Sequence, residues 1–351
     1  MAEPGESEGP ALPELLGRLV RGNDLDAHDA EAFFRAVMEG RTTPVLTAAL
    51  LTALRAKGEQ PAEVAGGVRA LRSVMIRVPV TDPDDVVDTC GTGGGAVTTF
   101  NISTAAALVA AGAGVRIAKH GNRSFTSRCG SADVLAELGV TLELSAEAMA
   151  DVLEEAGIVF MFAPLLHPAM RHVAPIRREL GIATVMNVLG PLTNPAGARR
   201  QVVGVADPAL VGLIARALLE LGHARALIVH GQPGLDEISP IGPTSGFEIR
   251  AGTLHEFHVE PGPLLGEPAG DAAGLAGGPP DHNARVILDV LEGRSRGVAR
   301  AAVLLNAAAA IYVADAAASM RDAMASARAA LDAGSGLAAL ERLRRATRAR
   351  A

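Results

Sequence analysis

A glycine-rich stretch is the most distinctive chemical feature of this sequence. It reads DTCGTGGG over residues 88–95, follows an apolar segment, and precedes an alanine-rich run that opens with Asn101, Ser103 and Thr104. A loop between a strand and a helix can bring backbone N–H groups and the positive end of the helix against phosphate oxygens. The alternative is a tight turn built from permissive glycines. No Lys-Ser/Thr pair follows and the GxGxxG spacing is absent, so we predict a phosphate loop of another kind.

A second segment, rich in cations and hydroxyl groups, follows the next predicted strand. It reads KHGNRSFTSRCGSAD over residues 119–133, within a chain whose net charge is -7. A solvated basic loop is the ordinary alternative. Cations, hydroxyl donors and glycines just beyond a strand end also suit an anion pocket, and the preceding phosphate loop favours that interpretation.

Two further segments carry candidate ligands. HGQPGLDEIS, residues 230–239, places Asp236 and Glu237 after a predicted strand and a glycine turn, and adjacent carboxylates suit Mg²⁺. HPAMRHVAPIRRELG, residues 167–181, places Arg171, Arg177 and Arg178 on or near a helix, where a guanidinium group could pair with a substrate carboxylate. Acids on a solvated turn and arginines on a helix surface are common, so neither segment identifies a site by itself.

The periodicity of apolar residues predicts the elements that must position these segments. Residues 12–78 show helical spacing, with Gly22, Gly40 and Gly58 at possible helix ends and no strand pattern. From residue 85 strands and helices alternate. We predict strands at 115–118, 158–162, 201–205 and 226–229, and helices at 102–111, 131–138, 146–155 and 208–221. The alternation predicts an α/β fold with a mostly parallel central sheet flanked by helices.

Three other segments complete the predicted organisation. Residues 167–198 contain a helix at 173–180 and then a turn-rich stretch, which we expect to pack back on the N-terminal helices. Residues 261–281 form a Pro/Gly-rich connection, and alanine-rich helices close the chain. The apolar run 301–314 is interrupted by Asn306 and is shorter than the roughly 20 residues of a membrane span, so it is expected to be a buried helix.

Composition excludes several classes of function. The 351 residues are 49% hydrophobic, enough for two domains. The acidic balance, with a pI near 5.7, gives no bulk attraction to nucleic acid. Two cysteines suit a reducing compartment, and the first ten residues, MAEPGESEGP, have no signal-peptide character. We therefore expect a flexible tail at 1–11, a cytoplasmic location, and neither a nucleic-acid nor a membrane partner.

The quoted segments, in this order and spacing, resemble the anthranilate phosphoribosyltransferase family of tryptophan biosynthesis. GTGGG with NIST, KHGNRSFTSRCGSADVLAELG, RRELGIATVMNVLGPLTNPAGA and HGQPGLDEIS carry the resemblance, which runs from about residue 12 to 343. It implies a small helical domain at 12–78, joined by about 168–196, and a larger α/β domain at 79–167 and 197–351. The implied fold is of the nucleoside phosphorylase and phosphoribosyltransferase type, and the implied assembly is a homodimer through the helical domain.

The resemblance also implies substrate and metal contacts. Phosphoribosyl pyrophosphate is expected at Gly91, Gly94, Gly95, Thr99, Asn101, Ile102, Ser103, Thr104, Lys119, His120, Gly121, Asn122, Arg123, Ser124, Phe125, Thr126, Ser127 and Ser131. Anthranilate is expected at Gly91, Asn122 and Arg177, and two Mg²⁺ ions per subunit at Ser103, Asp236 and Glu237. The family loop commonly reads GTGGD, whereas position 95 is glycine here, so we predict no metal contact there.

The implied reaction joins the phosphoribosyl group to the amine of anthranilate and releases pyrophosphate. Lys119 is expected to neutralise the leaving group, and His120 is a candidate proton acceptor, with a structural histidine as the alternative. Two other functions compete with this hypothesis. One is a pyrimidine nucleoside phosphorylase-like enzyme, and the other is a non-catalytic relative that binds a nucleotide.

Overall fold

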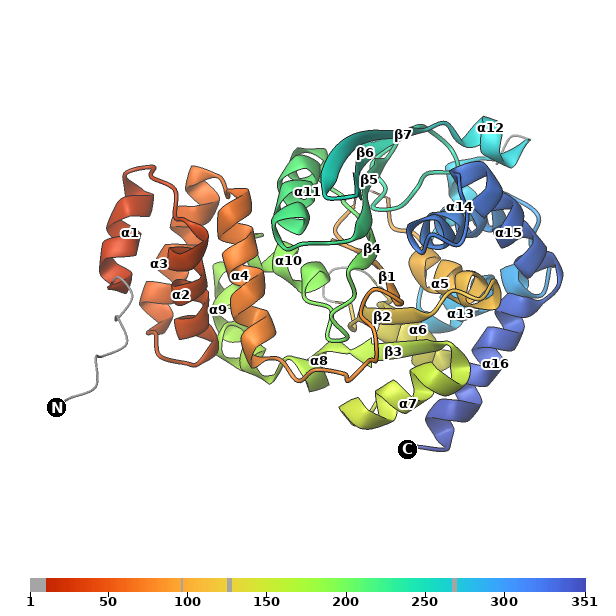
Figure 1. Ribbon diagram of the computed structural model, residues 1–351, viewed down its shortest axis with the longest axis horizontal. Coiled ribbons are helices and arrows are strands. Elements are labelled where there is room, and N and C mark those ends of the chain that lie inside the picture. Colours follow the sequence, from red (N-terminus) through yellow and green to blue (C-terminus); the bar gives the residue numbers. More distant parts are fainter. Residues whose placement is uncertain (1–10, 96, 125–127, 267–269) are drawn as a thin grey trace.

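The N-terminal part of the chain is entirely helical, as predicted. The computed structural model describes residues 11–95, 97–124, 128–266 and 270–351. Four helices come first: α1 (Leu12–Val20), α2 (Ala27–Met38), α3 (Pro44–Lys57) and α4 (Pro61–Val74). The side chains of Asp26 and Thr43 cap α2 and α3 at their N-termini, and Gly58 ends α3 with φ of 93°. Figure 1 shows these helices as a separate layer at one end of the molecule.

A seven-stranded sheet forms the centre of the larger part. Its strands are β1 (Val87–Gly91), β2 (Ile117–Gly121), β3 (Ile158–Phe162), β4 (Arg200–Gly204), β5 (Arg225–Gly231), β6 (Thr244–Arg250) and β7 (Thr253–Val259). The order is β3-β2-β1-β4-β5-β6-β7, and the five strands from β3 to β5 are parallel. This confirms the mostly parallel sheet. The antiparallel hairpin β6–β7, joined through Ala251 and Gly252 at positive φ, was not predicted.

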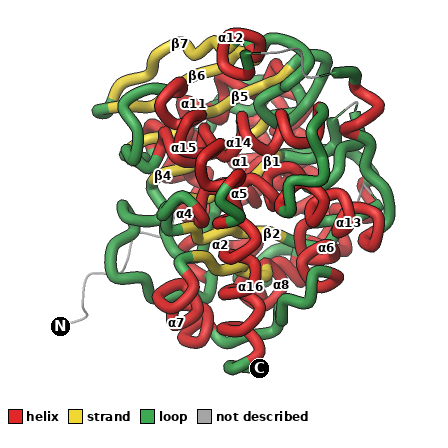
Figure 2. The backbone as a smooth tube through the Cα atoms, turned by 90° about the vertical axis from the view of Figure 1, so that its right-hand side faces the viewer, coloured by secondary structure: helices red, strands yellow, loops and turns green. Residues whose placement is uncertain are grey.

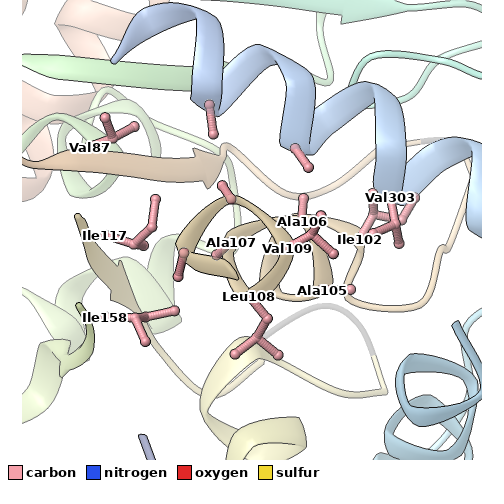
Figure 3. Close-up of a cluster of buried hydrophobic side chains, with 14 of the residues drawn as sticks. Val87, Ile102, Ala105, Ala106, Ala107, Leu108, Val109, Ile117, Ile158 and Val303 are labelled. Carbon is pink, nitrogen blue, oxygen red and sulfur yellow. The ribbon is translucent and has the colours of Figure 1, made fainter. Parts of the chain in front are cut away.

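Helices cover both faces of this sheet. They are α5 (Ile102–Gly112), α6 (Ser131–Glu137), α7 (Ala146–Ala156), α11 (Val211–Glu220), α12 (Pro261–Leu265), α13 (Pro280–Leu291), α14 (Val298–Val313), α15 (Met320–Asp332) and α16 (Ser335–Arg348), with 3-10 turns η3 (Pro208–Leu210) and η4 (Ala272–Leu275). The core between α5, α14 and the sheet is rich in alanine, which lets the two helices approach closely, and Val303 of α14 lies beside α5 (Figure 3). The buried helix expected at 301–314 is α14.

The opposite face of the sheet shares its core with the N-terminal helices. Side chains of α11, β4 and β5 belong to the same buried cluster as those of α1 to α4, and α4 packs against α11. The segment expected to return to these helices does so through α8 (Ala163–Leu166), η1 (Pro168–His172), α9 (Ala174–Leu180), α10 (Met186–Leu189) and η2 (Gly190–Leu192). Among its contacts, η1 touches α2, α9 touches α3 and α10 touches α4. Figure 2 views the molecule from the right-hand side of Figure 1, with β5, β6 and β7 near the top and the C-terminus at the bottom.

One predicted boundary was wrong in a way that matters for the site. The strand expected at 115–118 begins at Ile117 and continues to Gly121, because its parallel pairing with β3 extends to the Gly121–Phe162 pair. Lys119 and His120 therefore belong to a rigid strand end, whereas the sequence placed them in a loop. Among the described residues, no helix is both long and apolar enough to cross a membrane.

Candidate active site

Four neighbouring strands, β2, β1, β4 and β5, end in glycine. The loop after β5 that contains Asp236 and Glu237, the acidic loop, folds back over the ends of the last three. A Cβ atom at Gly204 of β4 would overlap the carbonyl oxygen of Asp236, and one at Gly91 of β1 would overlap its carboxylate. A Cβ atom at Gly231 of β5 would overlap the carbonyl oxygen of Glu237. The close approach of this loop to the sheet therefore depends on three residues without side chains. Sequence reasoning singled out Gly91 but not Gly204 or Gly231.

Asp236 and Glu237 connect the acidic loop to the glycine-rich loop and to α5. The Gly93 N–H donates to Asp236 Oδ2 at 2.9 Å, and the Ser103 N–H donates to Glu237 Oε1 at 3.1 Å. Burial raises the pKa of Asp236, and burial together with Asp236 raises the pKa of Glu237 to about 8, although Lys119 acts in the opposite direction. These carboxylates thus lie beside the backbone N–H groups of the predicted phosphate loop.

Lys119 lies beneath the same loops. Its side chain is buried, and Nζ donates to the backbone carbonyl of Thr89 and, at 3.2 Å, to Ser103 Oγ. Burial lowers its pKa, while Asp88 and Glu237 favour the charged form. Three segments that are distant in the sequence, around residues 91–103, 119 and 236–237, therefore meet at one edge of the sheet.

Asp88 is a buried acid that the sequence interpretation did not include. Its carboxylate accepts the His120 N–H at 3.1 Å and a hydrogen bond from Gln201 Nε2, also at 3.1 Å. Burial raises the pKa of Asp88, and Lys119 opposes that effect. Because Asp88 lies inside the sheet between β2 and β4, we interpret it as the group that fixes the end of β2 and partly balances the lysine charge.

His120 is paired with a second histidine. Its Nε2 lies 3.2 Å from Nε2 of His167, and both rings are buried. Burial lowers the pKa of His167 to about 4, and burial, then His167 and Lys119, lowers the pKa of His120 well below its ordinary value. Both rings are therefore neutral at pH 7, and one donates to the other. His167 begins the HPAMRH segment, in which only the arginines were considered as candidates.

The rest of the basic segment is organised by Asp133 at the start of α6. Its carboxylate accepts the N–H groups of Gly130 and Ser124 at 2.9 and 3.3 Å and pairs with Arg123 at 2.9 Å. The Asn122 carbonyl accepts Ser131 Oγ at 3.4 Å. Arg123 thus has an acid partner within the segment. The predicted contacts Phe125, Thr126 and Ser127 lie outside the described residues.

Asn101 joins this segment to the glycine-rich loop. Its Nδ2 donates to the Cys129 carbonyl at 3.2 Å, and its Oδ1 accepts Asn283 Nδ2 of α13 at 3.0 Å. Thr99 pairs with Ala276 in a short antiparallel bridge just before Asn101. Sequence reasoning missed Asn283, whose partner lies 182 residues earlier in the chain.

The remaining candidate site residues differ in which of their groups are available to a substrate. Gly94 has a φ of 76°, and a Cβ atom at Gly95 would lie 3.0 Å from the Gly234 carbonyl oxygen, so both positions suit glycine. Ile102 and Thr104 are buried in α5, which leaves only their backbone groups near the loops. Arg177 is half-buried on α9, burial lowers its pKa, and its guanidinium group contacts no polar partner in the described part of the chain.

The whole chain is similar to proteins of known activity. It matches the model of the glycosyl transferase family, a/b domain, over residues 83–337, and that of the helical bundle domain over residues 13–75. It is 52% identical to an anthranilate phosphoribosyltransferase from Rubrobacter xylanophilus, over 96% of this chain and 98% of that protein. A relative with the same activity from Roseiflexus castenholzii is 51% identical, over 95% of this chain and 97% of its own.

Solved structures of proteins with the same name are also similar to this chain over nearly its whole length. The anthranilate phosphoribosyltransferase from Thermus thermophilus superposes with a TM-score of 0.89 at 42% identity, covering 95% of this chain and 99% of that one. The Saccharomyces cerevisiae enzyme, solved in complex with PRPP and Mg, superposes with a TM-score of 0.87 at 27% identity, covering 96% and 98% of the two chains. The likeness thus extends over the helical and the α/β parts together.

Proposed function

The chain belongs to the anthranilate phosphoribosyltransferase family of glycosyl transferases, and we propose from its site that it transfers the phosphoribosyl group of 5-phosphoribosyl 1-pyrophosphate to anthranilate. The products are N-(5-phosphoribosyl)anthranilate and pyrophosphate. One observation carries the proposal: Asp236 and Glu237 contact the N–H groups of Gly93 and Ser103 beside the buried Lys119. Backbone N–H groups that can bind phosphate, a lysine and two carboxylates thus lie within one small region.

The donor atoms of this region fit magnesium. Ser103 Oγ and the carboxylates of Asp236 and Glu237 are hard oxygen ligands, and the raised pKa of Glu237 indicates a carboxylate without enough compensating positive charge. Bound Mg²⁺ would supply charge neutralisation on the pyrophosphate. The relative from Saccharomyces cerevisiae, solved with PRPP and Mg, supports this assignment. We propose two ions per subunit, to be counted by titrating the metal in the presence of phosphoribosyl pyrophosphate.

The residues of the site would position the two substrates and stabilise the charge that develops during the reaction. With substrate bound, the N–H groups of Gly93, Gly94 and the start of α5 would bind the phosphate oxygens, and those of Gly93 and Ser103 would exchange their bonds to Asp236 and Glu237 for this contact. Lys119 would stabilise the charge that develops on the departing pyrophosphate. As the bond to pyrophosphate breaks, the neutral amine of anthranilate attacks the sugar carbon and then loses a proton. The neutral ring of His120 can accept that proton at Nδ1 in the tautomer whose Nε2 donates to His167. We propose Asn122 and Arg177 as contacts of anthranilate.

A direct assay tests the proposed function. Purified protein is mixed with magnesium, phosphoribosyl pyrophosphate and anthranilate, and the loss of anthranilate fluorescence is followed together with pyrophosphate release. The proposal predicts equal amounts of both signals, abolished by a chelator. Phosphate consumption with a pyrimidine nucleoside would instead indicate a nucleoside phosphorylase. A folded protein that binds phosphoribosyl pyrophosphate but shows no anthranilate binding by calorimetry would be a non-catalytic relative.

The same proposal extends to pathway and location. We expect the enzyme to act in tryptophan biosynthesis in the cytoplasm, where its two cysteines, Cys90 and Cys129, would stay reduced. Expression in cells that lack this activity should restore growth without tryptophan. Fractionation of those cells should place the protein in the soluble fraction.

We also propose a homodimer formed through the helical part. The domains would comprise residues 12–78 with 168–196, and 79–167 with 197–351. Val20 at the end of α1, Val45 at the start of α3 and Ile182 after α9 are 72, 80 and 50% exposed, and α3 packs against both α1 and α9. Exposed apolar side chains on adjoining helices are typical of a subunit interface. Light scattering should give twice the monomer mass, and Val45→Glu should lower it.

A further inference from the structure

A single amide lies in the long, alanine-rich helix α14. Asn306 is near the middle of α14, in the sequence LLNAAAAI, and is only 3% exposed. An unpaired amide in such surroundings costs roughly 1–3 kcal/mol, so each of its polar atoms needs a partner. An apolar residue would fill this position without that requirement, and the bonds of Asn306 show what the amide provides.

Asn306 binds both backbone groups of one residue in the acidic loop. Its Oδ1 accepts the Ile238 N–H at 2.9 Å, and its Nδ2 donates to the Ile238 carbonyl at 3.0 Å and to the Ala302 carbonyl at 2.9 Å. The Ile238 N–H belongs to the peptide that links Ile238 to Glu237. This pair of bonds therefore fixes the peptide planes on both sides of Ile238, directly beside Glu237.

The same helix also supports the residue whose N–H donates to the Glu237 side chain. α14 packs against α5, whose Ser103 N–H donates to Glu237 Oε1 at 3.1 Å. Figure 3 shows Val303 of α14, one turn before Asn306, beside the first turn of α5. One rigid helix thus sets the position of the Glu237 backbone through Asn306 and supports the helix that holds the Glu237 side chain. The loop itself approaches the sheet too closely to tolerate side chains at Gly204 or Gly231.

We propose that Asn306 is a positioning residue for the binding of magnesium with phosphoribosyl pyrophosphate. It acts through Ile238, and it holds Asp236 and Glu237 in the orientation in which both can reach the metal. This inference rests on the proposed function. A merely structural role would lower stability when the amide is removed, but it would leave the affinity of the folded protein for the metal complex unchanged.

Three variants separate the two roles. Asn306→Leu removes the amide and fills its space, so that water cannot reconnect the Ile238 groups. Asn306→Ala leaves a space in which a water molecule can do so, and its effect should be smaller. Thr347→Val is the control, because Thr347 is equally buried and accepts the Thr141 N–H at 3.3 Å on α16, outside the loops of the site.

Binding is measured by calorimetry with magnesium and phosphoribosyl pyrophosphate, without anthranilate, and folding is checked by thermal denaturation. We expect Asn306→Leu to weaken binding about tenfold or more, Asn306→Ala to weaken it less, and Thr347→Val to remain within twofold of the wild type. If Asn306→Leu does not fold, Asn306→Ala provides the comparison. Equal affinity of a folded Asn306 variant and Thr347→Val would overturn the inference. Absence of binding by the wild type would instead contradict the proposed function.

Discussion

Two glutamates, Glu63 and Glu237, show how differently the helical part and the sheet edge compensate a carboxylate. Glu63 on α4 is fully buried and accepts the Leu25 N–H at 2.9 Å, the Gln60 N–H at 2.8 Å and Lys57 Nζ at 3.1 Å. Glu237 accepts only the Ser103 N–H at 3.1 Å among the described residues, and it adjoins a second acid. Burial and Asp236 raise the pKa of Glu237 to about 8.

The difference agrees with the proposed roles, in which the charge of Glu63 serves the fold and that of Glu237 serves a ligand. Glu63 is compensated by groups of the protein itself, so its carboxylate joins α4 to the segment before α2 and stabilises the helical part. Glu237 has too few partners inside the protein, so a cation from outside can complete its surroundings. The following predictions test this contrast by changing one region at a time.

The largest effect is expected from the removal of the charge of Glu237. Glu237→Gln should lower kcat/KM by roughly 100-fold or more, about 3 kcal/mol, because the neutral amide binds magnesium poorly. Its free energy of unfolding should stay the same or rise, since folding disfavours the charged form at this position. Steady-state kinetics over a range of magnesium concentrations provides the measurement. Wild-type activity with unchanged metal dependence would contradict the assignment.

The matching change in the helical part should lower stability and leave activity almost unchanged. Glu63→Gln leaves the buried Lys57 ammonium group with only the exposed Asp24 as a carboxylate partner among the described residues, and should lower the free energy of unfolding by about 3 kcal/mol. Activity below the melting temperature should stay within about twofold of the wild type, because Glu63 contacts none of the substrate loops. Urea denaturation and the fluorescence assay measure the two quantities. A large loss of kcat at full folding would remove the distinction between the regions.

The next largest effect is expected from a change at Gly204, where the sheet contacts the acidic loop. Gly204→Ala should lower activity roughly 30-fold and destabilise the fold by about 2 kcal/mol, because the added Cβ overlaps the Asp236 carbonyl oxygen. Gly212→Ala on α11 is the control: its Cβ would meet the end of the Arg216 side chain at 3.4 Å and Phe247 Cε2 at 3.8 Å, which is ordinary contact. That control should be neutral or slightly stabilising. Equal kinetics of the two variants would show that the loop does not need the strand-end glycine.

The smallest effect concerns a buried base outside the substrate loops. Burial, then Arg72, lowers the pKa of His223 to about 3, whereas the unfolded chain takes up this proton near pH 6.5. Stability should therefore fall as the pH drops below 6.5, because the unfolded state binds the proton first. His223→Gln should reduce the loss between pH 6.5 and 5.5 by about 1 kcal/mol without changing kcat. Denaturation curves at both pH values test it, and parallel losses in the two proteins would refute it.

The sequence predicted the segments of the site better than the contacts within them. The strand-helix alternation placed three candidate loops at one edge of a parallel sheet, and the structure brings Gly93, Ser103, Lys119 and the two acids together. Such an outcome follows from topology, because the carboxyl ends of parallel strands lie on the same edge.

The missed residues are those whose importance depends on distant partners. Gly204 ends an apolar strand and belongs to no recognisable motif. Asn306 interrupts an apolar run, and its partner Ile238 lies 68 residues away in the sequence. His167 pairs with His120 across 47 residues. The β6–β7 hairpin was missed because its strands carry more polar and exposed residues than the buried strands do. A glycine at a strand end and a lone amide in an apolar helix are the signals that could have identified the first two.

The central claim is that the glycine-rich loop, Lys119 and the acidic loop hold one phosphoribosyl pyrophosphate molecule. A crystal structure of the protein with magnesium and this substrate tests it most directly. We predict that the pyrophosphate lies against the N–H groups of Gly93 and Gly94 and that magnesium contacts Asp236 and Glu237. A substrate bound elsewhere, with these two carboxylates still bonded only to Gly93 and Ser103, would contradict the account.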